Sequence, residues 1–173
     1  MVQALSSLIP LGQVGPDMVE ELLDRAFGSG RFERTAYKVR AGTEALPALG
    51  FAALDEDEML VGTIQAWPVA LNDPAGRAHP MIMVGPVAVL PERQGEGFGT
   101  ALMVAQQQAI GDLAGSLPQV LIGDAPYYGR FGFAAEPTQG WSLPGPYEKD
   151  RLLVRCANPA VLPREGKLGP WLR

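Results

Sequence analysis

The chain has 173 residues, a formal net charge of −5, one cysteine and one histidine. Its length suits a single domain over residues 1–173, with a core large enough to need no covalent staples. The lone cysteine excludes an intrachain disulfide, the two counts together argue against a metal site, and the acidic balance argues against a nucleic-acid partner.

The first residues are not expected to form a signal peptide. The N-terminus, MVQALSSLIPLG, lacks the basic start and the long apolar core of a signal peptide. No apolar stretch of the sequence reaches membrane-spanning length. We therefore expect a cytoplasmic protein with no membrane partner.

The N-terminal part of the chain predicts a strand followed by two helices. Residues 1–12 are expected to form the strand. In residues 15–30, apolar side chains recur at helical spacing, Pro16 suits the first turn and Gly28 suits the end. Residues 31–42 predict a second, short helix, which Gly42 would end.

The middle of the chain is rich in strands. Residues 50–57 and 58–71 predict a hairpin whose turn is acidic, and residues 71–80 predict a loop. Residues 81–90, MIMVGPVAVL, are apolar at nearly every position, which is typical of a strand buried on both faces. Gly85 and Pro86 interrupt this strand. Because proline cannot donate to a ladder, we expect a gap between neighbouring strands there.

The C-terminal half begins with a glycine-rich loop that leads into a helix. A short buried strand at 119–123, an aromatic turn or short helix at 124–133 and a late strand at 150–156 follow. The tail, from about residue 157 to residue 173, is expected to pack on the surface. This order of elements predicts a mixed α/β domain around one central sheet.

The loop QGEGFG places three glycines between a strand and a helix. Such an arrangement binds phosphate, because bare backbone amides approach the anion and the helix dipole favours it. A P-loop would need Gly-Lys-Ser/Thr where this chain has Gly99-Thr100-Ala101, and a dinucleotide fingerprint would need glycine instead of Thr100. The bland alternative is a tight turn that binds nothing.

This loop, with the pattern Gln-x-x-Gly-x-Gly from Gln94 to Gly99, resembles the pyrophosphate loop of the GNAT superfamily of acyl-CoA-dependent N-acyltransferases. VGPVAVLPERQGEGFGTALM resembles that family's fourth strand, loop and third helix. LIGDAPYYGRFGF resembles its fifth strand and the short helix that ends in a Gly-Phe pair, and WSLPGPYEKDRLLVRC resembles the later strands of the YhbS-like branch. The resemblance covers roughly residues 50–156. It implies a twisted, mostly antiparallel sheet, splayed between its fourth and fifth strands and flanked by helices.

The resemblance also implies a cosubstrate, acetyl-CoA, and no metal. The strand residues Val87, Ala88 and Val89 would pair with the pantetheine arm, and a backbone N–H among them would stabilise the carbonyl oxyanion. The pyrophosphate would be held by the amides of the loop and the first helical turn. Arg93 could help, although the family's pattern does not require it. The amides in question belong to Gln94, Gly95, Glu96, Gly97, Phe98, Gly99 and Thr100.

Tyr128 occupies the position where the family often places its general acid. A phenol can protonate the thiolate that leaves when an amine attacks a thioester. The alternative for Tyr128 is a packed aromatic ring. The base that takes the amine's proton stays open among Glu92, Asp124 and His79, since the family has no fixed position for it.

The predicted function is therefore transfer of acetyl from acetyl-CoA to a primary amine, by direct attack in a ternary complex. The acceptor would be a small molecule or a peptide, and the tail or a late strand could form a homodimer contact. Two alternatives stay open: a catalytically inactive, coenzyme A-binding sensor or interaction module, and a structural protein whose loop binds nothing.

Overall fold

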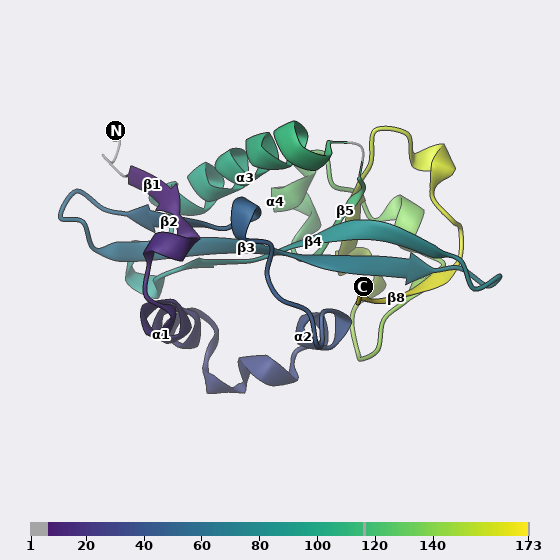
Figure 1. The fold of residues 1–173 in the computed structure, drawn as a ribbon, viewed down its shortest axis with the longest axis horizontal. Helices are drawn as coiled ribbons and strands as arrows, with labels where there is room; N and C mark the ends of the chain where they lie inside the picture. The colour runs from purple at the N-terminus through teal and green to yellow at the C-terminus, as the bar shows by residue number, and fades with distance from the viewer. Residues whose placement is uncertain (1–6, 116, 173) are drawn as a thin grey trace. The chain divides into compact units, whose positions relative to one another are not determined.

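The computed structural model describes residues 7–115 and 117–172 (Figure 1). Short 3-10 turns join several of its regular elements. In chain order these are β1 (Ser7–Pro10), α1 (Pro16–Phe27), α2 (Thr35–Val39), β2 (Phe51–Leu54), β3 (Leu60–Asn72), β4 (Ala78–Val89), α3 (Phe98–Ala114), β5 (Gln119–Ile122), α4 (Ala125–Gly129), β6 (Trp141–Ser142), β7 (Leu152–Arg155) and β8 (Gly166–Pro170).

The strands form one mostly antiparallel sheet. Its path is β1-β2-β3-β4-β5-β7, and β8 pairs with both β3 and β6. The β4–β5 and β6–β8 pairs are parallel, whereas the β1–β2, β2–β3, β3–β8 and β5–β7 pairs are antiparallel. This confirms the predicted fold class, a mixed α/β protein built on a largely antiparallel sheet with helices beside it.

The described residues divide into two compact units. The first comprises residues 7–32, 45–66 and 85–115, and the second comprises residues 33–44, 67–84 and 117–172. The long strands β3 and β4 each contribute one segment to the first unit and one to the second. The single domain expected for residues 1–173 stays a prediction.

Helix α1 of the first unit forms where the spacing of apolar residues predicted it. Pro16 stands at its first position, and Gly28 ends it with a φ of 90°. Its buried residues, Val19, Leu22 and Leu23, lie three and four positions apart, so they share one face of the helix. The spacing of apolar residues in the sequence was therefore sufficient to predict helix α1.

Both other N-terminal predictions need correction. The predicted strand at 1–12 is limited to Ser7–Pro10 among the described residues, because a 3-10 turn takes over at Leu11–Gln13; residues 1–6 lie outside them. The predicted helix at 31–42 is limited to α2, because a 3-10 turn occupies Ser29–Glu33.

The β2–β3 hairpin is as predicted, with a shorter first strand. Ala52 pairs with Thr63, and the register shifts between Ala53 and Leu54. The strand stops before Asp55, because that carboxylate accepts the backbone N–H groups of Asp57 and Met59 and so forms the turn itself.

Strand β4 is longer than predicted. It begins at Ala78, whereas the sequence assigned residues 71–80 to a loop, because the connecting turn closes within Asp73–Arg77. Its ladder with β5 consists of Ile82–Gln119 and Met83–Val120. The ladder therefore ends on β4 just before Gly85, in keeping with the predicted splay. The peptide bond between Gly85 and Pro86 is cis.

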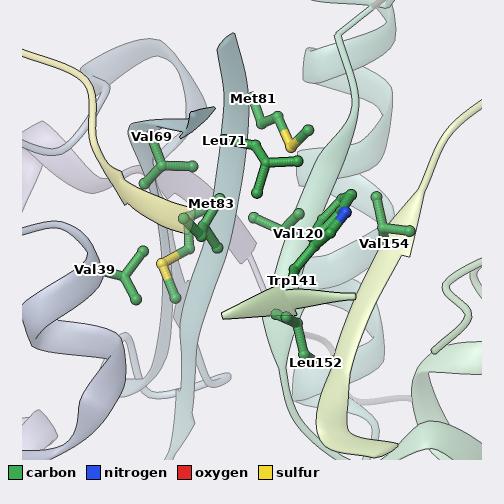
Figure 2. Packing of buried hydrophobic residues seen from close by; sticks show 10 residues of the cluster. Val39, Val69, Leu71, Met81, Met83, Val120, Trp141, Leu152 and Val154 are labelled. Carbon is green, nitrogen blue, oxygen red and sulfur yellow. The ribbon is translucent and has the colours of Figure 1, made fainter. Parts of the chain in front are cut away.

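The second unit has its own hydrophobic core (Figure 2). The indole of Trp141 is 1% exposed, and its Nε1–H donates to the carbonyl of Pro163. Strand β8 completes this core with Leu168, which is 2% exposed. The sequence predicted surface packing for the tail, and the structure makes part of it a strand. The core residues come from α2, β3, β4, β5, β6, β7 and β8: Val39, Val69, Leu71, Met81, Met83, Val120, Trp141, Leu152, Val154 and Leu168.

Across residues 7–115 and 117–172, no helix is both long and apolar enough to cross a bilayer. The same residues contain no cluster of three or more His, Cys, Asp or Glu side chains suited to a metal ion.

Candidate functional site

The glycine-rich loop belongs to the first unit and joins a 3-10 turn at Pro91–Arg93 to helix α3. Two of its glycines have left-handed backbone conformations, with φ of 87° at Gly95 and 93° at Gly97. Side chains rarely tolerate such angles, so glycine is required for this path. Gly97 is also the N-cap of α3, where no side chain caps the helix.

Five consecutive backbone amides of this loop are available to a ligand. Within the described part of the chain, the N–H groups of residues 95–99 have no hydrogen-bond partner. The first amide of the turn that is paired within the helix is that of Ala101, which donates to the carbonyl of Gly97. Because α3 is 17 residues long, its dipole adds positive potential at this end. The arrangement suits a phosphate or pyrophosphate.

The strand residues predicted to pair with pantetheine lie at the end of β4. Ala88 is fully buried, and Val87 and Val89 are half-buried. The side chain of Gln94 donates from Nε2 to the carbonyl of Val89 at 3.3 Å. Gln94 therefore ties the start of the loop to the strand that precedes it.

A charged network beside the loop was missed by the sequence analysis. Arg93 Nη1 lies 2.8 Å from Asp55 Oδ2, and Arg93 Nε and Nη2 each lie 3.0 Å from an oxygen of Glu96. The spacing of Arg93 and Glu96 could have indicated their pair. Nothing in the sequence indicated Asp55, because its contact depends on the hairpin turn 38 residues earlier. Hydrogen bonds from Met59 N–H and Arg93 hold the pKa of Asp55 below its usual range.

Tyr128 belongs to the second unit, in the short helix α4. Asp124 starts this helix: its carboxylate accepts the N–H of Tyr127 at 3.1 Å, and its carbonyl accepts the N–H of Tyr128. The Tyr128 ring meets that of Tyr127 edge-on, at 4.8 Å between centroids, and lies 6.3 Å from that of Phe133. The ring is therefore held by aromatic neighbours.

A bare backbone at Gly123 makes room for this ring. A Cβ at position 123 would lie 2.6 Å from Cε2 of Tyr128, closer than carbon atoms can pack. Burial raises the pKa of Tyr128 to about 12, with the neighbouring Tyr127 as a second cause. The phenol is therefore neutral at physiological pH and can donate a proton or a hydrogen bond.

The three candidate bases each have a partner. Glu92 pairs with Arg25 at 2.5 Å, and its own backbone N–H and this guanidinium lower the pKa of Glu92. His79 Nε2 lies 2.9 Å from Asp73 Oδ2, while Asp124 caps helix α4. The choice among them is as open in the structure as in the sequence.

The structure thus brings the predicted loop residues together within one unit, along the end of β4 and the start of α3. The predicted acid, Tyr128, belongs to the other unit. The roles assigned to all of these residues stay predictions.

Comparison with known protein families supports the resemblance that the glycine-rich loop indicated. The model of the acetyltransferase (GNAT) domain family matches residues 16–135. The chain belongs to the GNAT acetyltransferase family. The match takes in α1, the hairpin, β4, the glycine-rich loop, α3, β5 and α4. No curated protein matches the chain.

Solved structures of GNAT proteins share this fold. A GNAT family N-acetyltransferase, YhbS, from Escherichia coli, solved with CoA, has a TM-score of 0.70 at 21% identity, over 99% of this chain and 91% of its own. A GNAT family acetyltransferase from Brucella melitensis, solved with acetyl-CoA, has a TM-score of 0.63 at 26% identity, over 95% and 94%. An acyl-CoA N-acyltransferase from Pseudomonas aeruginosa has a TM-score of 0.53 at 19% identity, over 88% and 97%.

The first structure is a YhbS protein, the branch that the later strands of this GNAT chain resemble, and at its low identity the likeness shows the fold. Two of these GNAT neighbours were crystallised with a coenzyme A species. Membership of the family supports an N-acyltransferase.

Proposed function

We propose that this GNAT protein is an acyl-CoA-dependent N-acyltransferase that transfers acetyl from acetyl-CoA to a primary amine. The observation that carries the proposal is the run of five unpaired amides at residues 95–99, at the start of a long helix. The pyrophosphate of coenzyme A carries the negative charge that these donors match. The coenzyme-bound GNAT neighbours support the same ligand.

In this proposal the chain's residues divide the binding work. The amides of residues 95–99 hold the pyrophosphate, whereas the N–H of Gln94 already donates to the carbonyl of Pro91. The backbone of Val87, Ala88 and Val89 pairs with the pantetheine amides as an added strand would. One N–H of that strand segment stabilises the oxyanion that forms at the thioester carbonyl. A ligand held at several backbone groups needs few charged side chains, which suits an acidic protein.

The reaction itself is direct aminolysis of the thioester. The amine nitrogen attacks the carbonyl carbon, a C–N bond forms, and the C–S bond breaks. The amine loses one proton to a base, and Tyr128 gives one to the departing sulfur. With a pKa of about 12, well above the value of about 8.5 for a thiol, the phenol of Tyr128 acts chiefly by donating a hydrogen bond that stabilises the anionic leaving sulfur.

The acceptor is proposed as a primary amine of a small molecule or a peptide. The net charge of −5 favours a cationic acceptor through long-range attraction. An acylated product would lose that cationic charge, so the same attraction would not retain it.

Thermal unfolding with excess acetyl-CoA tests the binding part of this proposal, with ATP and NAD as matched nucleotide controls. A ligand that binds only the folded state at about a hundredfold excess over Kd stabilises it by about 2.7 kcal/mol. We expect a shift with acetyl-CoA and none with the controls. If no acyl-CoA shifts the unfolding temperature, the proposal is contradicted.

A panel of primary amines then tests turnover, with release of the free thiol of coenzyme A as the signal. We expect at least one cationic amine to be acylated. One observation favours a second function, a coenzyme A-binding module without turnover: each candidate base is already engaged by a partner. Tight binding with no product from any amine would support that function instead.

A further inference from the structure

The anion-binding loop carries a carboxylate at its centre. Glu96 lies between Gly95 and Gly97, in the middle of the residues whose amides lack partners in the described chain. Its side chain is 43% exposed, so no burial hides its charge. A negative group at this point opposes the negative ligand that the neighbouring amides favour.

The carboxylate of Glu96 shares one cation with a second carboxylate. Arg93 holds Glu96 through Nε and Nη2, both at 3.0 Å, and holds Asp55 through Nη1 at 2.8 Å. We call these three residues the Asp55–Arg93–Glu96 network. With two carboxylates and one guanidinium, its formal charge is −1. Arg93 also lies over the ring of Phe98, 5.3 Å from its centroid, which fixes it beside the first turn of α3.

The network has two readings, one structural and one electrostatic. As a staple for the fold the Arg93–Glu96 pair is weak, because Glu96 is 43% exposed and water competes with it, whereas Asp55, at 10% exposed, is better shielded in its pair with Arg93. The electrostatic effect of the network on a bound anion is larger. The charges of Arg93 and Glu96 belong to the loop, so they lie within about 8 Å, one Debye length, of a ligand held by the loop's amides and are only partly screened. The electrostatic reading therefore accounts for more.

We propose that Glu96 lowers the affinity of this loop for coenzyme A, and that Arg93 limits that loss by neutralising Glu96 and Asp55. The proposal rests on the proposed function and names the residues that set coenzyme affinity in it. Removing the charge of Glu96 leaves Arg93 with one carboxylate, so a neutral pair faces the phosphates. Removing Arg93 leaves two unpaired carboxylates, so repulsion is at its greatest.

The consequence concerns release of the product. Free coenzyme A and acetyl-CoA present the same phosphates to the loop, so Glu96 weakens both complexes alike. Since differences in affinity within one interface arise mostly in the dissociation rate, the carboxylate shortens the time that spent coenzyme stays bound.

The test measures the affinity of coenzyme A by calorimetry for wild type, Glu96→Gln, Arg93→Met and the double variant. We expect Glu96→Gln to bind about threefold to tenfold tighter and Arg93→Met to bind at least about tenfold weaker. The double variant should recover most of the loss, because one of the two unpaired carboxylates is gone. All differences should shrink at high salt.

Two further measurements separate charge from geometry. Dephospho-coenzyme A keeps the pyrophosphate, so Glu96→Gln should improve its binding almost as much as that of coenzyme A, whereas uncharged pantetheine should show no gain. Glu56→Gln makes the same change in net charge at an exposed position next to Asp55, and it should change affinity less than about twofold. Circular dichroism checks that each variant folds, and if Arg93→Met does not, Glu96→Gln decides.

Each remaining outcome contradicts one claim. If wild type binds no coenzyme A species, the proposed function fails and the role of Glu96 fails with it. If wild type binds and Glu96→Gln binds equally or more weakly, the proposed function survives and Glu96 merely holds the loop. If the double variant binds as weakly as Arg93→Met alone, Glu96 does not cause that loss and the proposed role of Arg93 is overturned.

Discussion

The glycine-rich loop and the stretch from Asp124 to Phe133, which we call the α4 segment, are both short and contain glycine, and they use their backbones in opposite ways. In the loop, the amides of residues 95–99 have no partner within the described chain. In the α4 segment, the carbonyl of Tyr128 accepts the N–H groups of both Phe131 and Phe133, and Asp124 accepts those of Tyr127 and Tyr128. The first presents its backbone to a ligand, while the second uses its backbone to hold one side chain.

The difference also separates two uses of glycine. Gly95 and Gly97 are required by their backbone angles, and a Cβ on either would meet nothing within 4 Å. Gly123 is required by space, because a Cβ there would overlap the ring of Tyr128. Mutations in the loop should therefore act on ligand affinity, and mutations around α4 should act on stability and on turnover.

The largest expected effect is on stability, in the α4 segment. Phe133 is 3% exposed and packs beside Tyr128, so Phe133→Ala should lower the free energy of unfolding by about 3–5 kcal/mol. Phe32→Ala is the control, because Phe32 is 57% exposed and its loss should cost about 1 kcal/mol or less. Denaturant unfolding measures both free energies. Equal losses would contradict the claim that the packing of Phe133 stabilises the α4 segment.

The next effect is on turnover. Tyr128→Phe keeps the ring and removes the proton, so kcat on an accepted amine should fall about a hundredfold. The KM for acetyl-CoA and the thermal shift should stay near wild type, because the loop is untouched. Steady-state kinetics checks this, and an unchanged kcat would refute the acid role of Tyr128.

A smaller effect is expected on binding, in the loop. Gly97→Ala places a side chain at a φ of 93°, which costs about 1–2 kcal/mol. Because the free loop of the variant relaxes to avoid this cost and coenzyme A selects the original path, binding should weaken about tenfold. Gly30→Ala is the matched control, since a Cβ there meets nothing within 4 Å and no left-handed angle is involved. Calorimetry compares the two variants, and equal affinities would show that the loop geometry is not needed.

The smallest effect is confined to alkaline pH. A phenol has a pKa of about 10 when unfolded, and burial raises the pKa of Tyr128 to about 12 in the folded protein. A raised pKa stabilises the folded state below pH 10, and this stabilisation is lost as the pH rises through 12. Ultraviolet titration should show a late tyrosinate component in wild type that is missing from Tyr128→Phe.

Much of the fold followed from local pattern. Helix α1 was predictable because its buried residues repeat at helical spacing and its ends carry proline and glycine. The loop was predictable because the positions of its glycines match a known family pattern. In both cases the information lies within a few neighbouring residues.

What the sequence missed depends on residues that are distant in the chain. Strand β8 forms only because Val69–Asn72 offers it a partner about a hundred residues earlier. The contact of Arg93 with Asp55 and the pKa of Tyr128 likewise depend on packing, which no local spacing encodes. The short extent of the β4–β5 ladder was indicated by Gly85 and Pro86, but its register was not.

Strand β8 makes Gly166–Pro170 part of the sheet. It pairs with β3 from Val69 to Asn72, so a chain cut at residue 165 would leave those backbone groups without their partner. An uncovered strand of this kind is a template for self-association. The shortened protein should therefore aggregate where the full chain does not, which light scattering would reveal, and purification tags are better attached at the N-terminus.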